Sequence, residues 1–312
     1  MMNFIPYGKQ SIDEDDINSV VEVLKSDFLT TGPKIKEFED ELCRYTNAKY
    51  CVAVANGTAA LHLASLVLLN KGDKVITTPN SFVATSNSIL YVEAKPIFVD
   101  IQEDGNIDLD LCEEELKKDR SIKALYVVNF SGNIVNQKKL KYLKESYNIK
   151  ILEDCAHSLG ATFEDIKAGS CENSDCSILS FHPVKHITTG EGGAVTTNSK
   201  EIYEKLLELR AHEIKRLPEF APWYYEMHSL GFNYRITDMQ AALGISQLKK
   251  LDSFINRRKE IALKYDKAFL NSVVKPLYSF TNNSSYHLFV VKVDFSKLNI
   301  SKIELFNKMR EK

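Results

Sequence analysis

Lys185 lies in the stretch SFHPVKHITTGEGG, which spans residues 180–193 and also holds a proline, two histidines and three glycines. This turn is too restricted for a freely solvated surface loop, so we expect its amine to be aimed inward. A lysine held in this way can form a Schiff base with an aldehyde. The alternative interpretation of Lys185 is an ordinary surface charge.

Two further features predict chemistry at the same edge of a sheet. Asp154 ends the apolar run ILED, and a buried carboxylate there is costly unless it meets a cation such as a protonated pyridine nitrogen. Gly57 and Thr58, in NGTAAL, occupy a strand-to-helix turn whose free N–H groups and helix dipole suit a phosphate monoester. Taken singly, Asp154 could be a turn residue and Thr58 an ordinary N-cap. Together with Lys185 they supply what pyridoxal 5'-phosphate requires.

Other kinds of site have weaker signals. The sequence GEGG is not a dinucleotide fingerprint, and the chain has no GxxxxGK[ST] loop for nucleotide phosphates. His182 and His186 have the spacing of zinc ligands on a helix, but Pro183 argues against a helix there, and no metal is expected. Cys155 and His157 could form a thiol nucleophile, although alternate residues that leave a strand often share a face without any chemical role.

The elements that position these residues alternate between strands and helices. This alternation predicts a mostly parallel sheet with helices on both faces, and ligands in such sheets collect at the carboxyl ends of the strands. The predicted strands include residues 50–54, 74–79, 95–101, 123–130, 149–156 and 177–181. The predicted helices between them include residues 57–69, 81–94, 108–119 and 136–148.

A change of pattern near Thr237 divides the chain into two predicted domains. Residues 1–236 form a large cofactor-binding domain with an N-terminal arm, and residues 237–312 form a connecting helix and a smaller α/β domain. Thr237 is the expected N-cap of one long helix that runs to about Leu270. A strand over residues 286–295 and a helix from about Ser301 make a poor core, so we expect this second domain to be incomplete through truncation.

The composition is that of a globular enzyme without a strong charge preference. Forty basic and forty-two acidic side chains give a net charge of -2, which provides no global field for nucleic acid or an anionic membrane. No segment predicts a membrane span or a signal peptide. The six cysteines are scattered without CxxC spacing, which indicates a reducing, cytoplasmic compartment.

An ordered series of motifs resembles the DegT/DnrJ/EryC1 sugar aminotransferases, which are fold type I pyridoxal phosphate enzymes. The motifs are PYGKQSIDEDDINSVV, ITTPNSFVATSN, EDCAHSLGA, SFHPVKHITTGEGGAVTT and GFNYRITDMQAALGISQLKKL. The resemblance implies an α/β fold with a mostly parallel central sheet between helices and a smaller C-terminal α/β domain. It implies a pyridoxal phosphate-dependent nucleotide-sugar aminotransferase that works as a homodimer with shared active sites.

The same resemblance implies a role for each matching residue. Lys185 would carry the cofactor as an internal aldimine, and Asp154 would pair with its pyridinium nitrogen. Phe82 would stack on one face of the ring, and His157 would lie near its phenolic oxygen. The residues implied to hold the phosphate are Gly57, Thr58, Ala59 and Ser180 of one subunit and Asn233 of its neighbour.

Two of these motifs resemble the branch of the family that leads to pseudaminic acid and surface glycans. The implied substrate is UDP-2-acetamido-2,6-dideoxy-β-L-arabino-hex-4-ulose, and L-glutamate is the implied amino donor. Tyr7, Asp27 and Thr30 would border the sugar; an N-terminal arm that packs on the partner subunit is the alternative interpretation of these residues. His186 replaces the asparagine that many relatives have after the lysine, which weakens assignment to other branches.

Three alternatives remain open from the sequence. The first is an aminotransferase for a different nucleotide ketosugar or a different carbon. The second is a dehydratase that uses pyridoxal or pyridoxamine phosphate, a reaction that this fold supports when histidine replaces the lysine at position 185. The third is a non-catalytic relative that keeps the fold.

Overall fold

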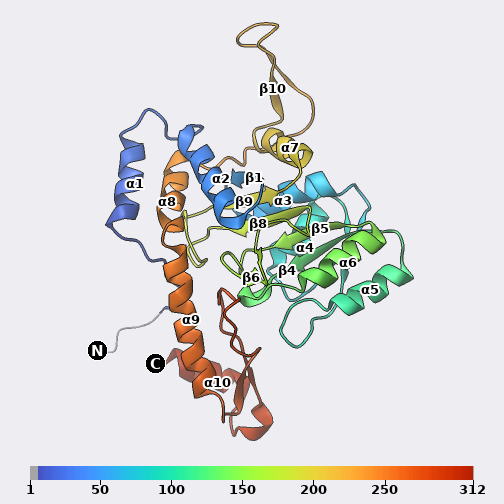
Figure 1. Ribbon diagram of the computed structural model, residues 1–312, viewed down its shortest axis with the longest axis vertical. Helices are drawn as coiled ribbons and strands as arrows, with labels where there is room; N and C mark the ends of the chain where they lie inside the picture. Colours follow the sequence, from blue (N-terminus) through green and yellow to red (C-terminus); the bar gives the residue numbers. More distant parts are fainter. Residues whose placement is uncertain (1–5, 312) are drawn as a thin grey trace.

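A seven-stranded sheet forms the centre of the protein in the computed structural model, which describes residues 6–311 (Figure 1). Strand β9 runs antiparallel to its neighbours β1 and β8, whereas the ladders from β8 through β5, β4 and β2 to β3 are parallel. The prediction of a mostly parallel sheet is therefore confirmed. In order across the sheet the strands are β1 (Tyr50–Val54), β9 (Gly193–Thr197), β8 (Cys176–Ser180), β5 (Lys150–Asp154), β4 (Ile122–Val128), β2 (Lys74–Thr77) and β3 (Lys95–Phe98).

Helices cover both faces of this sheet, and alternate residues of the strands contact different helices. Tyr126 of β4 packs with α3, α4 and α7, whereas its neighbours Leu125 and Val127 pack with α5 and α6 on the opposite face. At the other end of the sheet, α2 and α8 cover β1, β8 and β9. The helices that follow the strands are α3 (Gly57–Leu68), α4 (Val83–Tyr91), α5 (Leu109–Lys118), α6 (Gln137–Tyr147) and α7 (Lys200–Arg210).

Strand β9 is the element of the central sheet that the sequence pattern did not predict. Its sequence GAVTT directly follows the glycine-rich turn, and all its residues are buried. A short run of small and β-branched residues that is buried on both faces has no alternation to distinguish it from the preceding loop.

The predicted long helix from Thr237 is divided into α8 (Asp238–Leu248) and α9 (Leu251–Ala268). Thr237 is the N-cap as expected and forms a capping box with Gln240. Lys250, at the break, forms ion pairs with Asp13, the N-cap of α1 (Glu14–Leu24), and with Asp16 in its first turn. Lysine is a good helix former, so the sequence alone gives no signal for a break at Lys250, whose ion-pair partner Asp13 is 237 positions away along the chain.

The C-terminal part contains less regular structure than the sequence pattern indicates. The predicted strand over residues 286–295 is only β13 (Val291–Val293), which pairs with β12 (Val274–Pro276). The final helix, α10 (Lys302–Arg310), starts after the expected cap Ser301. The division of the chain at Thr237 stays a prediction, because α8 packs closely against both α1 and α2.

The remaining elements are short. The β10–β11 hairpin projects away from the sheet (Figure 1), and β6 and β7 form a second small hairpin. No helix among residues 6–311 is both long enough and apolar enough to cross a membrane. The bounds of these elements, with α2 and the 3-10 helices, are α2 (Pro33–Thr46), η1 (Phe130–Gly132), β6 (Thr162–Phe163), β7 (Ile166–Lys167), β10 (Ile214–Arg216), β11 (Tyr225–Met227) and η2 (Phe295–Lys297).

Asp238 joins two of the packed helices, and its loss should destabilise the fold. Helix α2 has Gly32 as N-cap and no side-chain cap of its own. The buried Asp238 carboxylate instead accepts the N–H groups of Gly32 at 2.7 Å and Lys34 at 2.9 Å. Asp238→Ala leaves both donors unpaired, so we expect the free energy of unfolding to fall by about 3 kcal/mol in a urea titration. The exposed Asp165→Ala is the control, and an equal loss in both variants would contradict this role.

Candidate active site

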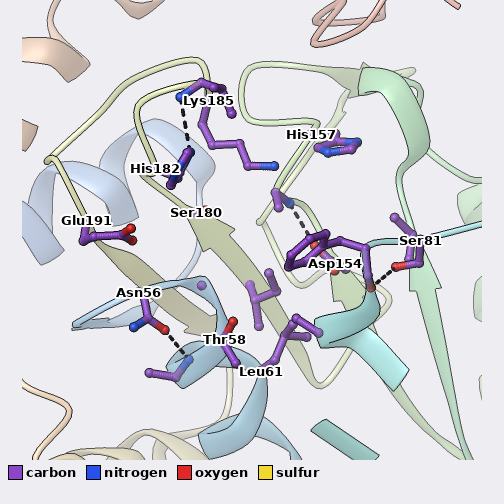
Figure 2. Close-up of a pocket in the computed structure, with 18 of the residues that line it drawn as sticks. Asn56, Thr58, Leu61, Ser81, Asp154, His157, Ser180, His182, Lys185 and Glu191 are labelled. Atoms are coloured by element: carbon purple, nitrogen blue, oxygen red, sulfur yellow. Dashed lines mark hydrogen bonds between the residues drawn. The ribbon is translucent and has the colours of Figure 1, made fainter. Parts of the chain in front are cut away.

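A pocket of about 720 Å³ opens at the carboxyl edge of the sheet, where β1, β5 and β8 end (Figure 2). Its walls come from the start of α3, the start of α4, the ends of β5 and β8 and the loop between β8 and β9. The pocket is lined by Asn56, Gly57, Thr58, Ala59, Leu61, Ser81, Phe82, Ala84, Val128, Asp154, Ala156, His157, Ile178, Ser180, His182, Val184, Lys185, Glu191 and Tyr234. The structure therefore brings together eight of the predicted site residues: Gly57, Thr58, Ala59, Phe82, Asp154, His157, Ser180 and Lys185.

The first turn of α3 forms an anion cradle in one wall of the pocket. Asn56 is the N-cap, and its side chain accepts the N–H of Ala59 at 2.8 Å. The alternative interpretation of Thr58 as the N-cap is therefore wrong. The N–H groups of Gly57 and Thr58 belong to the first turn of the helix, which has no acceptors of its own for them. Both residues line the pocket, so the positive end of the helix dipole lies at its wall, as a phosphate requires.

Close packing around the anion cradle explains why glycine stands at two positions. A Cβ atom on Gly57 would lie 3.1 Å from Cβ and 3.2 Å from Oγ of Ser180. A Cβ atom on Gly193 would lie 2.5 Å from the carbonyl oxygen of Asn56. These approaches set the Ser180 hydroxyl beside the first turn of α3, where it can join the N–H groups in binding an anion.

Asp154 lies at the end of β5 on the floor of the pocket, with only 5% of its surface exposed. Oδ2 accepts a hydrogen bond from Thr85 Oγ1 at 2.7 Å, and Oδ1 accepts the N–H of Ala156 at 3.1 Å. Burial raises the pKa of Asp154, while these two hydrogen bonds and the charge of Lys185 act in the opposite direction. The carboxylate is thus fixed in orientation and keeps capacity for a cationic partner in the pocket.

Lys185 extends into the pocket from the loop between β8 and β9 (Figure 2). Hydrogen bonds tighten this loop: Lys185 N–H donates to the carbonyl of His182 at 2.8 Å, and Thr189 N–H donates to the carbonyl of Phe181 at 3.0 Å. Burial lowers the pKa of Lys185, and the Asp154 carboxylate partly opposes this effect. The amine is therefore more readily deprotonated than an exposed lysine, which makes it a better nucleophile toward an aldehyde.

His157 and Phe82 border the space between Lys185 and Asp154. Burial is the main cause that lowers the pKa of His157 to about 3, and the Lys185 charge adds to it, so this imidazole is neutral at physiological pH. Phe82, the N-cap residue of α4, is 71% exposed in the single chain, and its ring borders the pocket. Both rings are placed where they can contact a planar ligand.

Four predicted residues lie outside this pocket in the single chain. Asn233 is exposed next to Tyr234, which does line the pocket. Tyr7 is 92% exposed, and Asp27 and Thr30 are also exposed, with Thr30 forming a backbone bridge to Thr237. The implied phosphate contact of Asn233 and the implied sugar contacts of the other three stay predictions.

The sequence reasoning missed residues that support the predicted ones. Thr85 orients Asp154 across 69 positions of the chain, and its own hydroxyl contacts Ser81 Oγ at 2.7 Å. No local pattern distinguishes Thr85 from any other polar residue in a helix. Asn56 could have been found, because an asparagine before a helix start is a strong N-cap signal. Glu191 and Tyr234 stand within motifs that were recognised, but their orientation depends on the fold.

The residues of the pocket fit pyridoxal 5'-phosphate. The anion cradle suits its phosphate, the buried carboxylate of Asp154 suits a protonated ring nitrogen, and the amine of Lys185 suits its aldehyde. All three groups line one pocket, whose volume lies in the range of cofactor sites. The alternative interpretation of Lys185 as an ordinary surface charge is wrong, because its side chain is half-buried and lines the pocket.

Comparison with known proteins agrees with this pocket. The profile of the DegT/DnrJ/EryC1/StrS aminotransferase family matches residues 10–312. The chain is 42% identical over 313 residues to the UDP-4-amino-4,6-dideoxy-N-acetyl-beta-L-altrosamine transaminase of Campylobacter jejuni, a match that covers 98% of this chain and 80% of that protein.

Solved structures are similar over the same range. Helicobacter pylori PseC, an aminotransferase involved in the biosynthesis of pseudaminic acid, superposes with a TM-score of 0.92 at 32% identity and covers 99% of this chain and 83% of that one. A Streptococcus pneumoniae protein described as a sugar aminotransferase, in its PLP form, has a TM-score of 0.88 at 32% identity and covers 99% of this chain and 82% of that one. These similarities confirm the expected fold class and cofactor.

Lys185 should be the residue that pyridoxal phosphate modifies. Its lowered pKa gives it a larger neutral, nucleophilic fraction than an exposed lysine has at the same pH. We expect borohydride reduction of the loaded protein at neutral pH to fix the cofactor on the peptide that contains Lys185, as identified by mass spectrometry. Lys141→Ala, which removes an exposed lysine on α6, is the control and should be labelled like the unchanged protein. Equal labelling of Lys185→Ala would contradict the assignment.

Proposed function

Because the chain belongs to the DegT/DnrJ/EryC1/StrS aminotransferase family, we propose that it aminates carbon 4 of a 4-keto-6-deoxy UDP-N-acetylhexosamine with L-glutamate as donor. The chain is a pyridoxal phosphate-dependent sugar aminotransferase. The proposed substrate is UDP-2-acetamido-2,6-dideoxy-β-L-arabino-hex-4-ulose, on the route to pseudaminic acid and surface glycans. The observation that carries the proposal is the joining of Lys185, Asp154 and the anion cradle in one pocket, in a chain that resembles the Campylobacter jejuni transaminase along nearly its full length.

Different residues of the pocket would bind the phosphate, the ring and the ring nitrogen of the cofactor. Gly57, Thr58, Ala59 and Ser180 would hold the phosphate, and Phe82 would pack on the ring. Asp154, held by Thr85 and Ala156, would keep the ring nitrogen protonated. Bound pyridoxal phosphate supplies an aldehyde that condenses with amines and a ring that accepts electrons from the reacting carbon.

Lys185 would move the protons of both half-reactions. Its free amine would take the proton from the α-carbon of glutamate and later deliver a proton to carbon 4 of the sugar. Burial favours its neutral form, which makes it a better base than an exposed lysine at the same pH. The loop held by the His182 and Phe181 carbonyls would keep the amine aimed at the reacting carbon through both steps.

We further propose a homodimer whose two active sites are shared. Large apolar side chains are exposed along α4 with its N-cap Phe82, which lines the pocket, and along the β10–β11 hairpin and the residues after it: Phe82, Val83, Leu90, Tyr91, Phe220, Trp223, Tyr225, Met227 and Leu230. Exposed apolar groups of this size are typical of a subunit interface. In the dimer Asn233 would contact the phosphate in the partner's pocket, and Tyr7, Asp27 and Thr30 would border the sugar. The free cysteines fit a cytoplasmic location.

A direct assay tests the proposed reaction. We expect the loaded protein to convert the UDP-4-keto sugar and 15N-glutamate into a 15N-labelled 4-amino sugar, identified by NMR. Lys185→Ala should lower kcat by at least about 10²-fold because it removes the general acid and base. Lys141→Ala should keep full activity. Amination at another carbon, or of a different ketosugar alone, would contradict the proposed substrate, and full activity of Lys185→Ala would contradict the proposed role of the lysine.

Mixing inactive variants tests the shared site. Lys185→Ala lacks the amine, and Asn233→Asp would set a carboxylate against the partner's bound phosphate, so each should be nearly inactive alone. A mixed dimer then has one intact site, and an equal mixture should regain about one quarter of full activity.

The matched control for this experiment mixes Lys185→Ala with Asp154→Asn. Both changes affect the same chain's side of a pocket, so no mixed dimer regains an intact site. Recovery in neither mixture, together with a monomeric mass by light scattering, would contradict the shared dimer.

A further inference from the structure

Three imidazole rings pack against one another next to Lys185. The ring centres of His157 and His287 are 4.3 Å apart with an angle of 31° between the planes, and those of His287 and His186 are 5.3 Å apart at 46°. Of the three, only His157 lines the pocket. One buried nitrogen in each ring has no hydrogen-bond partner among the described residues: Nδ1 of His157, Nδ1 of His287 and Nε2 of His186.

His287 belongs to a short segment, residues 283–288, that is built against the pocket wall. We call it the seating segment. Ser285 N–H donates to the carbonyl of Gly132 at 3.1 Å, and Ser285 Oγ donates to the carbonyl of His157 itself at 3.0 Å. Leu288 N–H donates to the carbonyl of Ser131 at 3.2 Å. These three hydrogen bonds fix the position of the seating segment relative to His157.

Two further features hold the seating segment in place. Gly132 has a φ of +105°, and a Cβ atom there would lie 2.7 Å from Ser285 Oγ and 2.8 Å from Tyr286 N, so glycine is required for this close approach. From α9, the guanidinium of Arg258 donates to the carbonyls of Tyr286 at 3.4 Å and His287 at 3.3 Å. His287 is therefore delivered to His157 by contacts from two separate parts of the chain.

The charged groups that face this histidine cluster are cations. They are Lys185 beside His157, and Arg258 from α9 beside His186 and His287. Burial is the main cause that lowers the pKa of all three histidines, and these cations lower it further. The cluster is thus a set of neutral rings. No group of three or more His, Cys, Asp or Glu side chains that could hold a metal ion occurs in the described part of the chain.

We propose that His287 is a positioning residue for the aminotransferase reaction. Its ring covers the side of His157 that faces away from the pocket, excludes water from it and holds it in orientation beside Lys185. The position of the seating segment therefore affects the orientation of His157 in the active site. The effect on turnover rests on the proposed function, whereas the effect on His157 does not.

NMR of histidine-labelled protein tests the effect on His157 directly. In the loaded protein we expect the His157 resonance, identified by its loss in His157→Gln, to stay unchanged between about pH 5 and pH 8, because its pKa lies near 3. His287→Ala should admit water and bring a titration of His157 into this range. His287→Phe keeps a flat ring, so the His157 resonance should again show no pH dependence in this range. His228→Ala removes an exposed histidine and is the control.

Kinetics separate positioning from a general loss of structure. His287→Ala should lower kcat by about tenfold or more with little change in KM for the donor, and it should have almost no additional effect in a His157→Gln background. A residue that only stabilises the fold would lower activity by the same factor in both backgrounds. Failure of the proposed sugar reaction would remove this kinetic test and leave the NMR test intact.

Each outcome decides the inference. A His157 resonance that does not titrate between about pH 5 and pH 8 in a folded His287→Ala protein would overturn it. Additive effects of His287→Ala and His157→Gln on kcat would overturn it as well. If His287→Ala does not fold, His287→Gln, which removes the ring and keeps a polar side chain, should give the same titration of His157. An unchanged resonance in His287→Gln would then overturn the inference.

Discussion

The site depends on one constraint, which is the placement of a buried carboxylate and a partly buried amine together in one pocket. Burial raises the pKa of Asp154 and lowers that of Lys185, and each group partly offsets the penalty of the other. Neither would keep its position against this penalty on a mobile loop. Asp154 is fixed by its place at the end of a central strand and by two hydrogen bonds. Lys185 is fixed by its loop, in which the carbonyls of Phe181 and His182 accept backbone hydrogen bonds. A desolvated site therefore needs a rigid frame, and the sheet provides it.

The position of the antiparallel strand β9 between β1 and β8 brings Asp154 and Lys185 close to the anion cradle. Ser180 pairs with Gly193 in the β8–β9 ladder, and Gly193 pairs with Val54 in the β1–β9 ladder. The loop that carries Lys185 therefore starts and ends beside the turn that would bind phosphate. The antiparallel β9 makes this possible, because a parallel strand would have needed a long crossover that separates the two functions. Small residues at positions 57 and 193 are the steric condition for this arrangement.

The local features of the site could be predicted from the sequence, while its tertiary partners could not. Lys185, Asp154 and Gly57 each follow or precede a recognisable strand, so their common edge followed from the parallel sheet. Thr85 is different, because its contact with Asp154 depends on how α4 packs on β5. The break between α8 and α9 and the strand β9 were missed for similar reasons: a distant ion pair marks the first, and burial on both faces hides the second.

Residues 286–295, which the sequence pattern predicts as one strand, form a strand only in part. The run YHLFVVKVDF reads as a strand because its residues have high β-propensity. In the structure its first residues leave the strand pattern: Leu288 N–H donates to the carbonyl of Ser131, and Ser285, just before the run, donates to the carbonyl of Gly132. That turn needs a left-handed φ at both residues, which no propensity scale connects to a segment more than 150 positions away. The position of His287 beside His157 therefore depends in part on the backbone at Gly132, which admits the close approach of Ser285 and Tyr286.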